Sequence, residues 1–392
     1  MPVTDWATDF DYFDSGFGSD PYPVWADLRA RCPIAHTDRW GGSFMPTRYE
    51  DVRAIAYDTE TFSSTKVSVA NVPENPDGIK APPITSDPPE HTWARRILLP
   101  MFAPKRVDAW EQYTRDYCNV LLDGVVSSGR ADAAVDYAQQ IPVRVISLML
   151  GVSAEQSPTF TRWVRQLLEF GALDPYGREE ARAEMITFFL GQIELKRAEP
   201  GDDIISQLLE LRVEGEPVEM THILGTCFLI LLAGIDTTWS SIGSSLWHLA
   251  TNPADRERLV ATPELIPTAI EEFLRAYSPV TMAREVTREV DYNGVRMCPG
   301  DKVLMPFPAG NRDPAMFPAP DSVIIDREQN RHSAFGIGIH RCLGSNLARM
   351  ELRVAIEEWL KRVPSFHLED PSEVTWSCGQ VRGPRSLPVL FG

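Results

Sequence analysis

The sequence predicts a mainly α-helical protein with a small β-rich part, folded as a single domain over residues 1–392. Helical periodicity dominates from residue 90 to residue 211, and turn-rich segments with the period of β-strands gather after residue 290. Hydrophobic residues make up 43% of the chain and charged residues 24%, which is ordinary for a globular protein that buries a large core.

The N-terminal part is predicted to combine short elements with a long loop. Residues 21–31 have apolar side chains one helical turn apart and predict a helix, which a strand at 42–48 and a helix at 51–58 follow. Residues 63–87 are polar and rich in Pro and Asn, which predicts a long irregular loop. Loops of that length inside a compact domain are usually functional.

The middle of the chain is predicted to be helical. Periodicity continues through residues 90–211, with a break near residues 171–177. Residues 220–249 then predict one long helix, whose apolar run at 223–235 is 13 residues long. A membrane span needs about 20 such residues, so we expect this helix to be buried in the protein core. A further helix is expected at residues 264–277.

The last part of the chain changes period. Asn293-Gly294 lies between two short strand-like segments and predicts a β-hairpin over residues 290–297. Residues 302–307 predict a further strand, residues 343–362 a final helix, and residues 375–391 short strands.

Charge and composition exclude some classes of function. The chain has 55 acidic and 38 basic residues and a net charge of -17, which argues against nucleic acid as the main partner. Its first ten residues show no basic region followed by an apolar stretch, so we expect a cytoplasmic protein without a membrane anchor.

One of the six cysteines lies in an unusual segment, Phe335-Gly-Ile-Gly-Ile-His-Arg-Cys-Leu-Gly344. Two alternate glycines let the backbone pass close to a flat, rigid group. Cys342 directly precedes the final helix, whose free N–H groups and dipole favour a thiolate. A thiolate is a good ligand for a soft or borderline metal. The ordinary alternative is a buried free cysteine in a glycine-rich turn.

A polar segment, Ala233-Gly-Ile-Asp-Thr-Thr238, interrupts the apolar centre of the long helix. A buried acid and hydroxyls are costly unless they are satisfied or used. Gly234 weakens a helix by about 1 kcal/mol and leaves space beside it, and threonine hydroxyls can bond back to a carbonyl and bend the axis. From these residues alone, a bent helix with a satisfied Asp236 and a functional acid–alcohol pair are both open.

Together the two segments resemble the cytochrome P450 superfamily, and the resemblance covers about residues 22–389. The distal pattern Ala/Gly-Gly-x-Asp/Glu-Thr is matched at residues 233–237. The resemblance implies the cytochrome P450 fold, with haem b (iron protoporphyrin IX) buried between the long central helix and the Cys-ligand loop and helix. The haem-binding signature Phe-Gly-x-Gly-x-His/Arg-x-Cys-x-Gly is matched by Phe335, Gly336, Gly338, His340, Cys342 and Gly344.

The same resemblance implies roles for individual residues. Cys342 is the expected iron ligand, and thiolate ligation favours O–O cleavage. Thr237 is expected to hold the dioxygen-derived ligand by a hydrogen bond, and Asp236 to gate proton delivery. Further haem contacts are expected at Phe335, Gly336, Gly344 and Ala233.

Charged residues outside the two motifs complete the expected haem site. A buried haem carries two propionates, which need cationic donors. The resemblance makes His91, Arg95, Arg284 and His340 the candidates, with ordinary surface charge as the alternative.

Glu272 and Arg275 share one face of the helix at 264–277. An exposed pair of this kind contributes only about 0.3 kcal/mol. The resemblance instead makes them a buried structural pair, joined by Arg327.

The expected function is that of a haem-thiolate monooxygenase. It activates dioxygen with two externally supplied electrons and inserts one oxygen atom, by hydroxylation, O-dealkylation or epoxidation, into a small to medium apolar substrate. A peroxide-driven oxygenase and a haem-based gas sensor are the alternatives. About fifty residues follow Cys342, so ferredoxin and ferredoxin reductase are the expected electron donors. A basic patch for their docking is expected at Arg341, Arg349, Lys105 and Arg106.

By the same resemblance, parts of several segments should line the substrate pocket. These are residues 62–83, 170–173, 230, 233, 280–283 and 378–381, which are mainly apolar or small.

Overall fold

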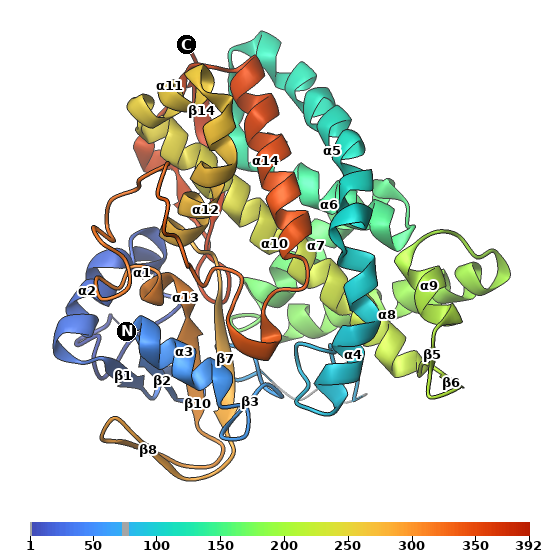
Figure 1. The fold of residues 1–392 in the computed structure, drawn as a ribbon, viewed down its shortest axis with the longest axis vertical. Helices are drawn as coiled ribbons and strands as arrows, with labels where there is room; N and C mark the ends of the chain where they lie inside the picture. The colour runs from blue at the N-terminus through green and yellow to red at the C-terminus, as the bar shows by residue number, and fades with distance from the viewer. Residues whose placement is uncertain (1, 73–77) are drawn as a thin grey trace.

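The computed structural model describes residues 2–72 and 78–392. Helices fill most of the molecule, and the main sheet lies to one side of them beside the N-terminal helices (Figure 1). The mainly α fold class is therefore confirmed. The α-helices are α1 Ser15–Ser19, α2 Tyr22–Arg31, α3 Tyr49–Tyr57, α4 Glu90–Leu98, α5 Pro104–Val125, α6 Gln140–Leu150, α7 Ser157–Leu168, α8 Pro175–Ala198, α9 Ile204–Glu210, α10 Met220–Thr251, α11 Pro253–Ala261, α12 Ile266–Ala276, α13 Phe307–Gly310 and α14 Ser345–Arg362.

The strands form one five-stranded sheet and several small ones. The larger sheet has the order β1-β2-β10-β7-β3, and its β10–β2 pair is parallel. The C-terminal β14 pairs with both β11 and β4 in a second sheet. The strands are β1 Ile34–Thr37, β2 Ser43–Pro46, β3 Phe62–Ser63, β4 Arg130–Asp132, β5 Arg212–Val213, β6 Glu216–Pro217, β7 Thr281–Val286, β8 Val290–Tyr292, β9 Val295–Met297, β10 Lys302–Pro306, β11 Phe366–Leu368, β12 Thr375–Trp376, β13 Pro384–Ser386 and β14 Pro388–Phe391.

Helix α10 is the centre of the core and packs against α6, α7 and α14. By length and composition it could cross a membrane, but most of its apolar window is buried inside the protein. A helix that is apolar on nearly every face needs such burial, because it has no side suited to water. The prediction of one long buried helix is confirmed.

Most predicted elements are present, with small differences at their ends. Helix α14 begins at Ser345 rather than at residue 343, because Gly344 is its cap residue. Helix α12 begins at Ile266 after a short 3-10 turn. The described part of the loop at 63–87 has no helix or strand beyond β3, as expected, whereas residues 73–77 of that loop lie outside the described residues.

Two strands were not predicted. Strand β7 is buried on both faces, so its sequence lacks the alternation that identifies a half-exposed strand. Strand β4 lies within the region predicted to be helical, and its pairing partner β14 comes from the far end of the chain. Local periodicity cannot show such a pairing.

Candidate active site

A large internal cavity lies between α10 and the turn that carries Cys342. Counted as room for the centres of water molecules, its volume is about 360 Å³. A single water needs only about 10–15 Å³ on that scale, so the cavity can hold a large cofactor and a substrate. The lining residues predicted to contact haem are Arg95, Ala233, Arg284, Phe335, Gly336, His340, Cys342 and Gly344.

The Cys342 side of the cavity is a tight turn. The N–H of Cys342 donates a hydrogen bond to the carbonyl of Phe335 at 2.6 Å, which closes the turn. Gly338 has a φ of +74°, and a Cβ there would lie 2.7 Å from the carbonyl oxygen of Ala56 in α3. The expectation that both alternate glycines make room for a flat group was therefore wrong for Gly338, because α3 occupies that space.

The Cys342 sulfur lies at the cavity wall in a positively charged environment. Burial raises the pKa of the Cys342 thiol, whereas the N–H of Gly344 and the charges of Arg95, Arg341 and Arg349 act to lower it. Donors and cations around a buried sulfur favour the thiolate once a metal is bound to it.

Three separate elements bring four nitrogen-bearing side chains to the same end of the cavity. His91 and Arg95 come from α4, Arg284 comes from β7, and His340 comes from the turn before Cys342. The rings of His91 and His340 meet edge to face, with their centroids 4.4 Å apart.

These side chains have hydrogen-bond donors that the described protein does not satisfy. The Nε2 atoms of His91 and His340 are buried and have no hydrogen-bond partner among the described residues. Burial, together with the charges of Arg284, His91 and Arg95, lowers the pKa of His340 to about 3. Burial also lowers the pKa of Arg284 to about 10. An anionic group placed here would satisfy these donors and reverse the cost of their burial.

On the opposite wall, α10 presents the predicted acid–alcohol segment. Ala233 and Thr237 line the cavity, and the Thr237 hydroxyl donates to the Ala233 carbonyl at 2.7 Å. A Cβ at Gly234 would lie 2.4 Å from Ile146 of α6. The expectation that Gly234 leaves space beside the helix was therefore wrong, since Ile146 fills it and brings α6 and α10 into close contact.

Asp236 points away from the cavity into a buried ion pair that the sequence analysis missed. Its Oδ1 lies 2.7 Å from Nη2 of Arg385 in β13, and neither side chain is more than 6% exposed. Burial raises the pKa of Asp236, and Arg385 acts to lower it. No local signal identifies Arg385, because its partner lies on a helix far away in the sequence.

Glu351 of α14 is a second missed residue. It is fully buried, and neither carboxylate oxygen has a hydrogen-bond partner among the described residues. Burial raises the pKa of this carboxyl well above its ordinary value. A signal was present, since Glu351 falls on the apolar face that Leu347 and Val354 define.

Glu272, Arg275 and Arg327 form one buried cluster beneath the Cys342 turn segment. Glu272 accepts from Nε and Nη2 of Arg275, each at 2.8 Å, and from Nε of Arg327 at 3.0 Å. Arg275 and Arg327 then donate to main-chain carbonyls of the loop after α13. The cluster holds that loop against α12.

Known proteins share this architecture and sequence. The family model described as Cytochrome P450 matches residues 257–375. The chain is 34% identical to the mycinamicin IV hydroxylase/epoxidase of Micromonospora griseorubida over 89% of each protein. It is 34% identical to the vitamin D(3) 25-hydroxylase of Pseudonocardia autotrophica, over 97% of this chain and 96% of that protein. The chain belongs to the cytochrome P450 family.

The solved structure of the P450 CYP109E1 from Bacillus megaterium, in complex with testosterone, superposes with a TM-score of 0.89 at 30% identity. It covers 97% of this chain and 100% of that one, which confirms the cytochrome P450 fold. The protein is a P450 monooxygenase that binds haem b.

The residues of the P450 cavity fit a haem. Cys342 offers the sulfur for the iron, and the unsatisfied donors of His91 and His340 with the cations of Arg95 and Arg284 offer partners for two propionates. Arg95 and Arg284 are also the only arginines or lysines among the described lining residues, which concentrates positive charge at one end.

The remainder of the P450 cavity is aliphatic, with a few hydroxyl and amide groups. Members of the predicted lining segments are present, but residues 170–173 are not among them. Phe170 and Leu173 are exposed because α7 ends at Leu168, which lines the cavity instead. The aliphatic lining residues away from the haem-binding motifs are Val67, Ala81, Pro83, Ile84, Leu168, Leu229, Ile230, Val280, Met282 and Val381.

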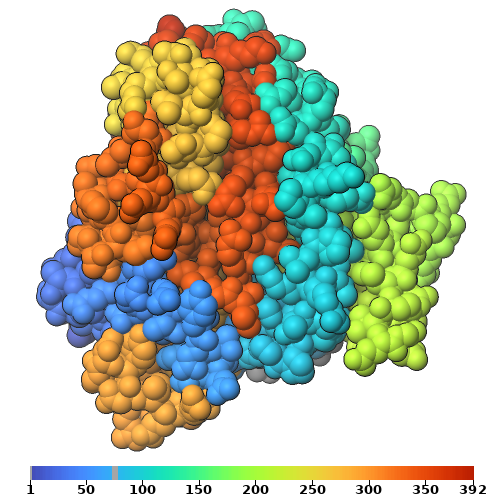
Figure 2. Space-filling model, in the orientation of Figure 1, coloured from blue at the N-terminus to red at the C-terminus, as the bar shows by residue number. Residues whose placement is uncertain are grey.

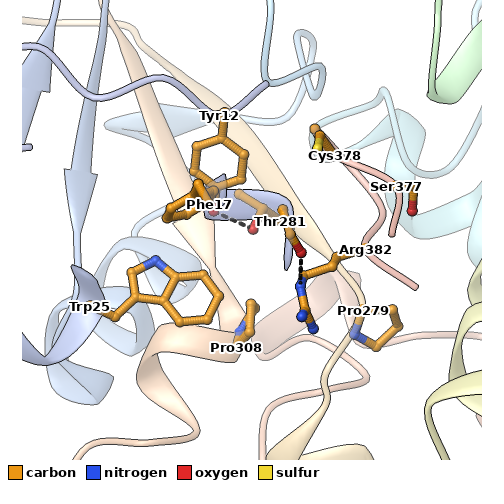
Figure 3. Close-up of a pocket in the computed structure, with 11 residues that line it drawn as sticks. Tyr12, Phe17, Trp25, Pro279, Thr281, Pro308, Ser377, Cys378 and Arg382 are labelled. Carbon is orange, nitrogen blue, oxygen red and sulfur yellow. Dashed lines mark hydrogen bonds between the residues drawn. The ribbon is translucent and has the colours of Figure 1, made fainter. Parts of the chain in front are cut away.

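Cys378, which was predicted to line the substrate pocket, lies instead at a separate void behind the cavity wall (Figure 3). This void has a volume of about 20 Å³, room for about one water. Tyr12 and Thr281 share a hydroxyl hydrogen bond of 2.7 Å beside it, and the N–H of Arg382 donates to Pro279 at 2.8 Å. These bonds fasten the loop at 377–382 to the start of β7.

The predicted basic patch is smaller than its sequence suggests. Arg349 is paired with Glu271, at 2.6 Å, and stacks over Phe335, while Arg106 is paired with Asp202 at 3.1 Å. Arg341 and Lys105 are exposed and have no ion pair among the described residues.

Proposed function

We propose that this P450 oxidises an uncharged, mainly aliphatic substrate of small to medium size. The observation that carries the proposal is the distribution of charge around the cavity. Both arginines of its described lining lie in the cluster assigned to the haem propionates, so the aliphatic part carries no charge. A charged substrate would lose its hydration there without gaining a partner.

The overall reaction that we propose is R–H + O2 + 2 e⁻ + 2 H⁺ → R–OH + H2O. Bound haem supplies the redox chemistry of dioxygen, and a thiolate ligand favours cleavage of the O–O bond. The protein holds the haem through Cys342 and the four propionate partners. Its aliphatic walls exclude water and orient the substrate.

Asp236 and Thr237 are the proposed groups for proton delivery. The reaction consumes two protons inside a cavity whose remaining walls are mainly apolar, so a positioned acid is needed. The Thr237 hydroxyl lines the cavity, and Asp236 is the adjacent residue on the same helix. This retained pair favours the dioxygen-dependent reaction over a peroxide-driven one.

A ferredoxin and its reductase are the proposed electron donors, acting in the cytoplasm. The segment after Cys342 continues into α14, which reaches the surface between α5 and α12 (Figure 2). Exposed Arg341 and Lys105 give this side positive charge for steering an acidic partner. Reduction should therefore slow as salt is raised, and a rate indifferent to ionic strength would rule out this docking surface.

The first test is spectroscopic. Reduced protein exposed to carbon monoxide should show the long-wavelength band of thiolate-ligated haem, and a Cys342→Ala variant should lose it. The absence of this band in the unaltered protein would exclude the assigned ligand.

The second test identifies the substrate class. Testosterone, vitamin D3 and mycinamicin IV, which the names of relatives suggest, should be titrated beside a long-chain carboxylate, with the Soret shift as the readout. We expect an uncharged compound to bind more tightly than the carboxylate, followed by an oxidised product under air with reductant. Tighter binding of the carboxylate would contradict the charge argument, and binding without product would favour a gas sensor.

A further inference from the structure

Three charged residues from separate elements form a buried chain behind the cavity. The guanidinium of Arg385, in β13, lies 2.7 Å from Oδ1 of Asp236 on α10. The same guanidinium lies 3.0 Å from Oε2 of Glu169 at the end of α7. Two carboxylates therefore share one buried cation, which also stacks 4.2 Å over the ring of Trp239.

The two carboxylates are not equivalent. Glu169 is 11% exposed and has a second cation, Arg165, at 3.0 Å. Asp236 is 1% exposed, and Arg385 is its one ion-pair partner in the described part of the chain. The other oxygen of Asp236, Oδ2, is buried without a hydrogen-bond partner among those residues. The state of Asp236 therefore depends on how closely Arg385 stays with it.

Each member of the chain is attached to a wall of the cavity. Glu169 directly follows Leu168, and the strand of Arg385 follows Val381 after a short turn; both Leu168 and Val381 line the cavity. Asp236 precedes Thr237 on the third wall. A substrate that fills the space between these walls displaces the ends of the ion chain.

We propose that Arg385 is a positioning residue that makes proton supply through Asp236 depend on substrate. Without substrate, Arg385 is shared by Asp236 and Glu169 and restrains Asp236. A substrate against Leu168 and Val381 shifts Arg385 toward Glu169 and releases Asp236 to carry protons. The inference rests on the proposed function, because it concerns the two protons of that reaction.

The benefit lies in avoiding a wasteful reaction. Productive turnover is R–H + O2 + 2 e⁻ + 2 H⁺ → R–OH + H2O. Without a substrate, the same electrons and protons give O2 + 2 e⁻ + 2 H⁺ → H2O2. Restraint of Asp236 in the empty enzyme slows the supply of protons to the second reaction.

Two substitutions should act in opposite directions. Glu169→Gln removes the competing carboxylate, so Arg385 stays with Asp236 when substrate binds. We expect kcat to fall roughly tenfold and the solvent isotope effect to rise, with an unchanged substrate dissociation constant. Arg385→Gln removes the restraint, so peroxide formation without substrate should rise several-fold.

Infrared difference spectra give a readout that does not depend on turnover. Arg385→Gln leaves Asp236 buried without its cation, so the spectrum at neutral pH should gain the carbonyl stretch of a protonated carboxylic acid. That band should disappear when Asp236→Asn is added. Arg385→Lys keeps the charge and should restore the unaltered behaviour in part.

The matched control is Glu358→Gln. Glu358 is also a buried carboxylate paired with an arginine, Arg115, but it lies between α14 and α5 and does not line the cavity. We expect its peroxide formation, kcat and isotope effect to stay within about twofold of the unaltered enzyme. The substrate probe is whichever of testosterone, vitamin D3 and mycinamicin IV binds most tightly.

The outcomes separate this inference from the proposed function. If the unaltered protein lacks the carbon monoxide band or forms no product, the proposed function itself fails. If it passes both tests but Glu169→Gln behaves like Glu358→Gln, or the Glu169 and Arg385 variants change the rates in the same direction, the role of Arg385 is overturned. Should Arg385→Gln fail to fold, Glu169→Gln and Arg385→Lys still decide the matter.

Discussion

Replacing Glu272 by Gln should destabilise the protein far more than an ordinary ion-pair substitution. The Glu272 carboxylate accepts from two nitrogens of Arg275, one nitrogen of Arg327, the N–H of Ile324 and the side-chain amide of Asn330. Glu272 and Arg275 are fully buried, and Arg327 is 7% exposed. A glutamine has the same shape but carries no charge and only one accepting oxygen.

The magnitude follows from the burial of the two arginines. Removing one partner of a buried pair typically costs about 3–5 kcal/mol, because the remaining charge is left without compensation. Unfolding entropy of about 2.1 cal/mol/K per residue then converts this cost, for a chain of 392 residues, into a fall in Tm of roughly 4–6 °C. The loop after α13 should also loosen, since Arg275 and Arg327 donate to its carbonyls.

The assay is thermal unfolding of the haem-loaded protein, followed by circular dichroism and by Soret absorbance. Glu50→Gln is the matched control, because Glu50 and Arg53 have the same i,i+3 spacing but are 72% and 51% exposed. The control should change the free energy of unfolding by less than about 1 kcal/mol. Equal effects of the two substitutions would show that burial does not set the strength of the Glu272 cluster.

Three further predictions concern other parts of the site. Gly338→Ala should destabilise the protein by at least about 1–2 kcal/mol in urea unfolding, because φ is +74° there and the new Cβ would lie 2.7 Å from the Ala56 carbonyl; an unchanged midpoint would contradict this. Arg284→Leu should speed the transfer of haem to an acceptor protein roughly tenfold or more, since a charged propionate partner is lost, and an unchanged rate would remove Arg284 from the haem site. Glu351→Gln should gain stability relative to the unaltered protein as pH rises above about 4.5. The raised pKa of Glu351 keeps its proton in the folded state while the unfolded chain releases it, so the difference should grow by up to ~1.4 kcal/mol per pH unit between pH 5 and pH 8; a difference independent of pH would refute a protonated Glu351.

The residues that carry the chemistry could be identified from the sequence because they form short, contiguous patterns. The segments around Cys342 and Asp236 each place their fixed residue types within ten positions of one another. The long central helix was equally accessible, since its apolar character is a local property of the chain. The family, its haem and its reaction class followed from those patterns.

Other features depend on residues that are far apart in the sequence. The partner of Asp236 is Arg385, and the backbone that forbids a side chain at Gly338 belongs to Ala56. Strand β4 exists because β14 pairs with it, and Arg349 and Arg106 lose part of their availability to carboxylates on other elements. None of these pairings has a local period or motif.

The division has one physical reason. A sequence determines which residues have the right chemistry and which local conformation they favour, because those properties act over a few neighbouring positions. Burial, ion pairing and pKa depend on what the folded chain brings within a few ångströms. Only the tertiary structure could therefore decide that one buried arginine is shared by Asp236 and Glu169.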